Sequence, residues 1–261
     1  KPLLNDRALL AFEMGFDHVA LCLGAGAPNL IEMPGGLTPG VRYASDFLMT
    51  LHMGGAFKHD SLTSLEVSLP AYVVGGGLTA VDTATEILAY YPVQVTRFYE
   101  RYMELCLRLG EEAVRKLWVR DQLNKVDIFV RHGREILQER ECAQKEGRAP
   151  DFLPLLHSWG GIHILYRRAL QEAPAYRLNA HELQKALEEG VILHPHTRLE
   201  EVLSKGHGFV SHVRVFEKEN EKILEAGSVF LATGVRACEQ DGYHQDPRIT
   251  CYGDMDPKFS G

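Results

Sequence analysis

Three consecutive glycines separate an apolar run from a run with helical spacing in AYVVGGGLTAVDTATEILAYY, residues 71–91. Gly75, Gly77 and Ala80 match the pattern G-x-G-x-x-A, in which the first glycine permits a tight turn and the second lets backbone approach a pyrophosphate. The helix that follows would offer its first backbone N–H groups to the phosphates. This pattern predicts a dinucleotide-binding turn whose cofactor-binding residues are Gly75, Gly76, Gly77, Leu78, Thr79 and Ala80.

A second predicted feature is an acidic residue that binds the ribose of the dinucleotide. The segment VQVTRFY, residues 93–99, has apolar Val93, Val95 and Phe98 and predicts a strand that ends at Glu100. Glu100 stands about 20 residues past Ala80, where a carboxylate binds the ribose 2′-OH of NAD. Arg101 could instead pair with the 2′-phosphate of NADP. The spacing favours NAD slightly, and both residues stay candidates for cofactor binding.

These residues need a frame of strands and helices to position them. The expected frame is a strand at 71–74, a helix at 79–90 that ends before Pro92, and the strand at 93–99, which together make a βαβ unit. Residues 102–177 interrupt this rhythm and predict a helical insertion, including a helix over GGIHILYRRALQEA. After a further helix with Asn179 as candidate cap and Gly190 as its end, the remaining strands predict a β-meander and a buried last strand at 228–231.

The predicted fold class is therefore α/β. We expect a Rossmann-like NAD(P)-binding domain with a parallel sheet, a β-meander and a helical insertion.

Composition excludes several classes of protein. The chain has 261 residues and a net charge of −7, so it lacks the basic excess that non-specific nucleic-acid binding requires. It contains no apolar run of about 20 residues, the length that spans a bilayer. None of its five cysteines forms a CxxC pair, which favours a reducing, cytoplasmic setting and argues against a disulfide reductase. Because the first residue is Lys1, we expect a piece of a longer protein.

Other polar residues have weaker claims to a function. Asp82 on the first turns of the helix either stabilises the helix end or lies near the nicotinamide. His194 and His196 share a face of a strand, but a metal site would need a third ligand such as His207 or His212, so no metal site is expected. The segment HSWGGIH, residues 157–163, predicts a buried helix–loop junction, with a lid or partner contact as the alternative.

Five segments, in order and spacing, resemble one family of flavoenzymes. VVGGGLTAVD resembles the NAD(P)H-domain motif of the small subunit of glutamate synthase and its relatives, which include dihydropyrimidine dehydrogenase and, more distantly, adrenodoxin reductase. GFDHVALCLGAGAP resembles a strand of the FAD domain in that family, and PGVRYASDFL resembles the crossover between its two domains. VFLATGVR and CYGDMDPKFSG resemble the return strand and the segment that meets FAD.

The resemblance implies cofactors and partners. FAD would contact Gly234 and Asp254 in the full-length protein, hydride would pass from NAD or NADP to the flavin, and no catalytic side chain is needed. The flavin domain of the same chain and an iron–sulfur domain or subunit are the implied partners, with neither nucleic acid nor membrane. It implies an FAD-domain remnant with crossover at 1–50, the NAD(P)H-binding domain at 51–235 and a return to the FAD domain at 236–261.

Two departures from the family pattern lead to further expectations. Glu100-Arg101 stands where close relatives often have two arginines. The GxGxxG that holds FAD is missing, and Gly24-Ala25-Gly26 is followed by no helix, so it is interpreted as a flavin-domain remnant that cannot hold FAD by itself. The chain alone is therefore expected to be colourless and inactive.

Two alternatives stay open at this point. The first is a non-enzymatic dinucleotide-binding sensor or scaffold, and the second is a methyltransferase-like enzyme, which also has a glycine-rich turn and a ribose-binding acid.

Overall fold

The computed structural model describes residues 14–15, 27–204, 208–218 and 220–236. The chain divides into two compact units, of which one comprises residues 30–234 and contains the glycine turn. The other comprises residues 1–29 and 235–261, and its described residues include the short antiparallel pair β1 (Ala27–Pro28) and β10 (Val235–Arg236). The boundary near residue 30 differs from the expected one at 50, because β2 (Val41–Tyr43) pairs with a strand of the larger unit, whereas the boundary near 234 lies next to the expected one at 235.

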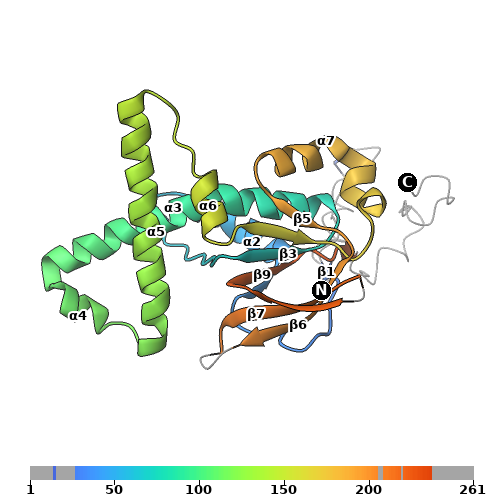
Figure 1. The fold of residues 1–261 in the computed structure, drawn as a ribbon, viewed down its shortest axis with the longest axis horizontal. Helices are drawn as coiled ribbons and strands as arrows, with labels where there is room; N and C mark the ends of the chain where they lie inside the picture. The colour runs from blue at the N-terminus through green and yellow to red at the C-terminus, as the bar shows by residue number, and fades with distance from the viewer. Residues whose placement is uncertain (1–13, 16–26, 205–207, 219, 237–261) are drawn as a thin grey trace. The chain divides into compact units, whose positions relative to one another are not determined.

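The larger unit is built on a parallel sheet of five strands in the order β2-β9-β3-β4-β5 (Figure 1). β3 (Ala71–Val74) lies at the centre, with β4 (Ile162–Leu165) on one side and β9 (Ser228–Leu231) on the other. β5 (Ile192–His194) continues the sheet beyond β4. The chain builds outward from β3 to β5 and then returns to the opposite side of β3. This is the order of a Rossmann-like dinucleotide-binding fold, so the α/β prediction is confirmed.

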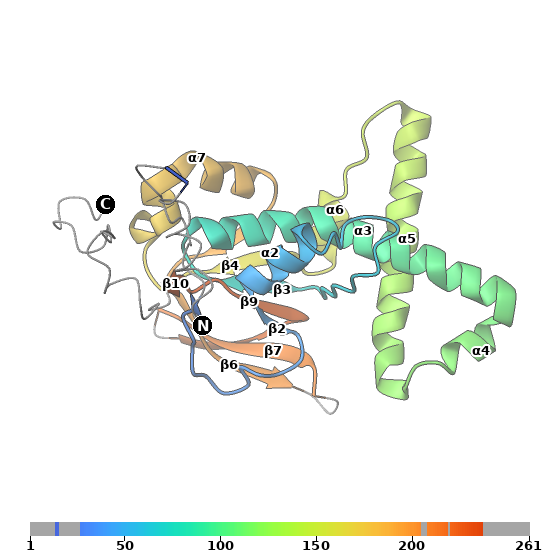
Figure 2. The same cartoon turned by 180° about the vertical axis from the view of Figure 1, so that it is seen from behind.

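Alternate residues of each strand face two different layers. Val73, Ile164 and Phe230 belong to the core beneath the helices, while Tyr72 and Leu231 belong to the core beneath the meander. Burial on both faces explains why these strands read as short, nearly continuous apolar runs. Both views show helices α3 and α7 on one side of the sheet and the meander on the other (Figures 1 and 2).

The meander and the first crossover follow the sequence pattern. β6 (Thr197–Ser204), β7 (Val210–Glu217) and β8 (Asn220–Glu225) form an antiparallel sheet with β7 in the middle. Val213 and Val215 are fully buried against the parallel sheet, and the intervening residues are partly exposed, as predicted for this strand. α2 (Ala44–His52) packs Phe47 edge-on against Phe230 of β9, with ring centroids 4.9 Å apart.

One predicted strand is wrong. Residues 93–99 lie inside α3 (Leu78–Leu109), which runs through Pro92 instead of ending before it. The buried positions Ile87, Tyr91 and Val95 and the half-buried Phe98 recur every three or four residues, which is the period of a helix. The stripe continues to buried Tyr102. Tertiary packing along this stripe outweighs the β-branched residues that suggested a strand.

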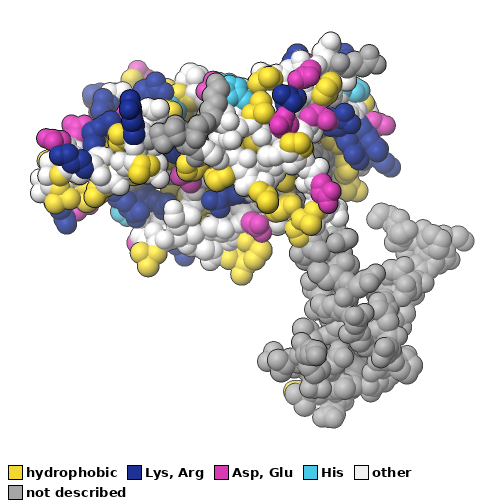
Figure 3. Space-filling view, turned by 90° about the horizontal axis from the view of Figure 1, so that it is seen from below, with side chains coloured by type: hydrophobic (Ala, Val, Ile, Leu, Met, Phe, Trp, Pro, Cys, Tyr) yellow, Lys and Arg dark blue, Asp and Glu magenta, His cyan; other side chains and the backbone are white. Residues whose placement is uncertain are grey.

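The distal half of α3 forms the base of the helical insertion. α4 (Glu111–Arg115) and α5 (Arg120–Glu146) follow it, and α5 crosses back over α3 (Figure 1). Gly133 makes this crossing close, because a Cβ there would lie 2.4 Å from the carbonyl oxygen of Val95. Charged and hydrophobic side chains are interspersed at the insertion's end of the molecule, on the left in Figure 3.

A second error concerns residues 160–173, which were expected to form a helix. After α6 (Leu153–Ser158), this segment supplies β4 and the 3₁₀ helix η1 (Leu170–Glu172). The insertion therefore ends before β4 and does not extend to residue 177.

The last helix follows the prediction more closely. α7 (Pro174–Glu188) contains non-helical dihedral angles at Asn179, so the helix is kinked near the predicted cap. Gly190 follows its end with a positive φ of 103°, as the predicted helix stop requires.

Candidate dinucleotide-binding site

The glycine turn lies at the carboxyl end of β3 and opens α3. Gly77 is the N-cap residue, with φ −91° and ψ 172°, and it has no side chain to cap the helix. The first bonds to its carbonyl come from the N–H groups of Ala80, at 3.0 Å, and Val81, at 3.4 Å. Within the helix, the N–H groups of Leu78 and Thr79 have no carbonyl to bond. Together with the helix dipole, they make this helix end a place where an anion is favoured.

Each glycine of the turn has a different environment. A Cβ on Gly75 would lie 2.3 Å from the carbonyl oxygen of Ala232, so only glycine allows β3 and the end of β9 to approach this closely. A Cβ on Gly76 would lie 2.3 Å from the ring of Tyr166. A Cβ on Gly77 would meet no atom within 4 Å in the part of the chain that the structure describes, its chain neighbours aside. The open side of the turn is thus at Gly77, the residue whose backbone was predicted to approach a pyrophosphate.

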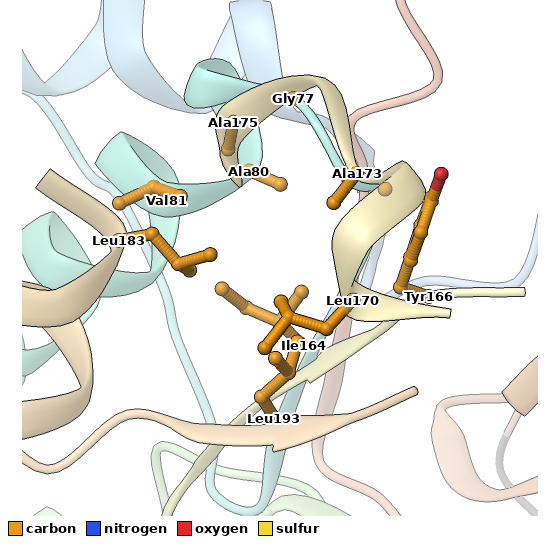
Figure 4. Close-up of a pocket in the computed structure, with 12 residues that line it drawn as sticks. Gly77, Ala80, Val81, Ile164, Tyr166, Leu170, Ala173, Ala175, Leu183 and Leu193 are labelled. Carbon is orange, nitrogen blue, oxygen red and sulfur yellow. The ribbon is translucent and has the colours of Figure 1, made fainter. Parts of the chain in front are cut away.

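The side of the turn that faces η1, α7 and β4 is closed by apolar packing. Leu170 of η1, Leu183 of α7 and Ile164 of β4 converge beneath the turn, and the void they leave has a volume of about 10 Å³ (Figure 4). That volume holds about one water-sized sphere. The N–H of Ala175 donates to the carbonyl of Gly76 at 2.9 Å and fixes the start of α7 to the turn. A dinucleotide would therefore lie outside this packing, along the open side of Gly77.

The carboxyl end of β9 meets the glycine turn. The N–H of Ala232 donates to Val74 at 2.9 Å, and Gly234 follows with a φ of 88°. The structure thus brings the Ala-Thr-Gly of the return strand beside Gly75. In an open parallel sheet, ligands bind outside the carboxyl ends of the strands where the strand order reverses, and here that point lies between β3 and β9.

The strand that follows the helix of the βαβ unit is β4, which ends at Leu165. Tyr166, Arg167 and Arg168 come directly after it, at the position where Rossmann-like folds read the adenosine ribose. The phenol of Tyr166 donates to the carbonyl of Glu172 at 3.0 Å, which fixes the ring over Gly76. Both arginines are exposed, and among the described residues neither forms an ion pair.

The sequence reasoning missed these residues because it assigned them to a helix. Gly160 and Gly161 before alternating Ile162 and Ile164 were the signal that could have identified the strand.

Glu100 and Arg101 do not occupy the predicted position. Glu100 lies within α3, about 33 Å along the helix axis from Leu78 at 1.5 Å per residue. Its carboxylate lies 3.8 Å from the imidazole of His59, and Arg101 donates to the carbonyl of His59 at 3.2 Å. The pair therefore contacts the loop before β3. The reasoning that assigned these residues to the ribose is wrong, because it depended on a strand that is a helix.

Asp82 lies one turn into α3 and is exposed. Partial burial, followed by the nearby carboxylates of Glu182 and Glu86, raises its pKa above the ordinary value. A helix N-terminus alone would lower this pKa. Partial burial and the nearby carboxylates thus oppose the stabilisation that the helix N-terminus gives to the charged form of Asp82.

The histidine-rich segments have structural contacts. Nε2 of His163 lies 2.6 Å from the carbonyl of Gly160, so this nitrogen carries the proton and Nδ1 accepts from Nε2 of His194 at 2.9 Å. Trp159 stacks on His132 of α5 with ring centroids 3.8 Å apart. It is only partly buried, and His157 and Ser158 before it are exposed, so the end of α6 is a partly buried junction and not a fully buried one. Among the described residues, no three histidine, cysteine or acidic side chains are grouped as a metal site would need.

Several predictions fall on residues outside the described ranges. They include Asp254, the Gly24-Ala25-Gly26 segment and His207. No helix in the described part of the chain is both long enough and apolar enough to cross a membrane.

Comparison with known proteins gives one clear sequence relative. No family model matches the chain. The uncharacterized protein RP006 of Rickettsia prowazekii (strain Madrid E) is 30% identical over 273 residues, which covers 96% of this chain and 36% of RP006. The chain thus spans about a third of the length of this curated relative.

Solved structures with partial likeness include reductases and an FAD-dependent oxidoreductase. Thioredoxin reductase from Gloeobacter violaceus has a TM-score of 0.39 and 15% identity, covering 82% of this chain and 40% of that one. An FAD-dependent pyridine nucleotide-disulphide oxidoreductase from Desulfovibrio vulgaris has a TM-score of 0.37 and 14% identity, covering 84% of this chain and 36% of that one. Scores and identities this low do not assign a function to the chain.

Proposed function

We propose that residues 30–234 form the nicotinamide-dinucleotide-binding unit of an FAD-dependent oxidoreductase. The observation that carries this proposal is the glycine turn between β3 and α3, whose open side, as far as the described residues show, is at Gly77. The unpaired N–H groups at the start of α3 suit a pyrophosphate, and the apolar packing behind the turn holds the backbone in place before a ligand arrives.

The residues after β4 favour NADP over NAD. A ribose 2′-phosphate needs cationic donors at this position, whereas a 2′-OH is bound by a carboxylate. Arg167 and Arg168 supply two guanidinium groups there, and each can pair with a phosphate through two parallel hydrogen bonds. No carboxylate follows β4 until Glu172, whose side chain lies 3.3 Å from the N–H of Ala169. This proposal replaces the preference for NAD that rested on Glu100.

The proposed reaction is transfer of hydride from the nicotinamide to FAD and then of electrons to another acceptor. The cofactors supply this chemistry, and the residues of the unit bind and orient the dinucleotide. The resemblance to the small subunit of glutamate synthase supports a flavin domain in the same chain as the first acceptor. It also supports an iron–sulfur domain or subunit as the next one. The resemblance likewise supports roles for Gly234 and Asp254 beside the flavin.

Calorimetric titration of the 261-residue chain with NADPH, NADH and S-adenosylmethionine tests the proposal. We expect NADPH to bind with about 1:1 stoichiometry and more tightly than NADH, and S-adenosylmethionine not to bind. Tight binding of S-adenosylmethionine alone would identify a methyltransferase-like protein. Stopped-flow reduction of FAD in the full-length protein then separates an oxidoreductase from a dinucleotide-binding sensor or scaffold. A sensor binds NADPH without bleaching the flavin.

A further inference from the structure

A basic pocket of about 540 Å³ lies next to the proposed ribose site. It is lined by Arg167, Arg168, His196, Arg198, Phe216 and Lys218. The first two follow β4, and the other four come from the β-meander and the turn that leads into it. A chain with a net charge of −7 thus gathers four permanent cations and one histidine around a single opening.

The backbone holds the two sides of this pocket together. The N–H of His196 donates to the carbonyl of Arg168 at 3.0 Å, and the N–H of Lys218 donates to the carbonyl of His196 at 2.8 Å. His196 and Lys218 have φ angles of 55° and 57°, and they are the non-glycine residues with positive φ among those described. Such conformations are strained for residues other than glycine, and they cluster at binding and catalytic sites. The strained backbone therefore places meander residues beside the arginines after β4.

The cations of the pocket are largely available for a ligand. Among the described residues, neither the two arginines after β4 nor Lys218 has a carboxylate within ion-pair distance. Arg198 pairs through Nε with Glu200, which leaves its two terminal NH₂ groups as donors. Its guanidinium also lies 6.0 Å from the centre of the Phe216 ring, which limits where the group can turn. Three of the four cations thus have no carboxylate partner among the described residues, and this net positive charge points to an anionic ligand.

We propose that Arg198 and Lys218 of the β-meander form the second half of a pocket for the 2′-phosphate of NADP(H). This inference rests on the proposed function and extends it, because discrimination between the two dinucleotides would be set jointly by the end of β4 and by the meander. The adenosine half of the ligand would follow the carboxyl edge of the sheet from Gly77 past Tyr166. Its phosphate dianion would then reach donors from both sides of the opening.

The double variant Arg198→Ala/Lys218→Ala tests the inference in the 261-residue chain. We expect the affinity for NADPH to fall roughly tenfold, as for the loss of exposed phosphate contacts, while the affinity for NADH changes less than about twofold. Binding of 2′,5′-ADP should weaken in parallel, and 5′-AMP should be unaffected. The advantage of NADPH over NADH in the wild type should also shrink as salt is raised.

The matched control is Arg214→Ala/Lys222→Ala, which removes the same two charges from β7 and β8 outside the pocket. If the control lowers NADPH affinity as much as the test variant, a general field effect explains the loss and the inference is overturned. It is also overturned if the wild type binds NADPH and the test variant binds it equally well, an outcome that leaves the proposed function intact. If neither dinucleotide nor 2′,5′-ADP binds the wild type, the proposed function and the inference both fail.

Discussion

Replacing Gly77 by valine separates a role in ligand binding from a role in folding. The φ and ψ of Gly77, −91° and 172°, are extended values that valine adopts readily. Beyond its chain neighbours, a Cβ there would meet no atom of the described residues within 4 Å. Valine is a poorer N-cap than glycine, but the substitution also lowers the entropy of the unfolded chain. These effects oppose each other, so we expect the free energy of unfolding to change by less than about 1 kcal/mol.

The effect on the dinucleotide should be much larger. The valine side chain would occupy the open side of the turn, where the pyrophosphate must approach the N–H groups at the start of α3. Loss of one charge-assisted hydrogen bond costs about 1.5–3 kcal/mol, which corresponds to a roughly 10- to 100-fold weaker affinity. Gly77→Ala places a smaller group at the same point and should give an intermediate loss.

Isothermal calorimetry with NADPH measures the affinities, and urea unfolding monitored by circular dichroism measures the stability. The wild type, Gly77→Ala and Gly77→Val should show increasing dissociation constants at nearly constant stability. Unchanged NADPH affinity in a folded Gly77→Val variant would refute the assignment of this turn to the pyrophosphate. A large loss of stability would instead show that the open side of Gly77 is filled in the folded protein.

Three further changes have distinct expected results. Glu100→Ala should change the dissociation constants of NADH and NADPH less than about twofold by calorimetry, because its carboxylate lies far along α3; a larger change would restore it to the site. Gly76→Ala should lower the free energy of unfolding by about 1–3 kcal/mol through a clash with the Tyr166 ring, and adding Tyr166→Ala should recover part of that loss in urea titrations. Burial, and then the nearby Arg131, lowers the pKa of His132 to about 4, so the unfolded chain takes up a proton that the folded chain resists. Stability contributed by neutral His132 is thus fully present above about pH 6.5 and should fall by up to about 3 kcal/mol as the pH drops toward 4. Urea titrations across this pH range measure the loss. If the free energy of unfolding of His132→Phe depended on pH as strongly as that of the wild type, His132 would not be its source.

Local sequence patterns predicted the elements at the centre of the fold, because the strand, the glycine turn and the half-buried strand each have a short-range signature. The apolar run at 71–74, the glycines after it and the alternation in β7 each match the observed strand, turn and half-buried strand. The predicted helix start is also confirmed within one residue, since Gly75 and Gly77 suit a turn that only small residues can make.

Long-range packing explains what the sequence could not reveal. Whether residues 93–99 form a strand or a helix depends on their packing against α5, which comes later in the chain. No local pattern within residues 93–99 reveals this contact. Gln94 illustrates this, because its amide bonds both backbone groups of Val67 at 2.8 Å and so ties α3 to the loop before β3. The insertion also moves β4 far beyond the usual spacing of about 20 residues from the glycine turn. For that reason the spacing selected Glu100 and overlooked Arg167 and Arg168.

The most direct test follows backbone amides during titration of the ¹⁵N-labelled, deuterated 261-residue chain with NADPH. The central claim is that the start of α3 and the residues after β4 hold the dinucleotide. The largest amide shift changes should therefore occur at Gly76, Gly77, Leu78, Arg167 and Arg168, with little change at Glu100 or along α5. Shift changes confined to α5 and the distal half of α3, with the glycine turn unaffected, would contradict this account.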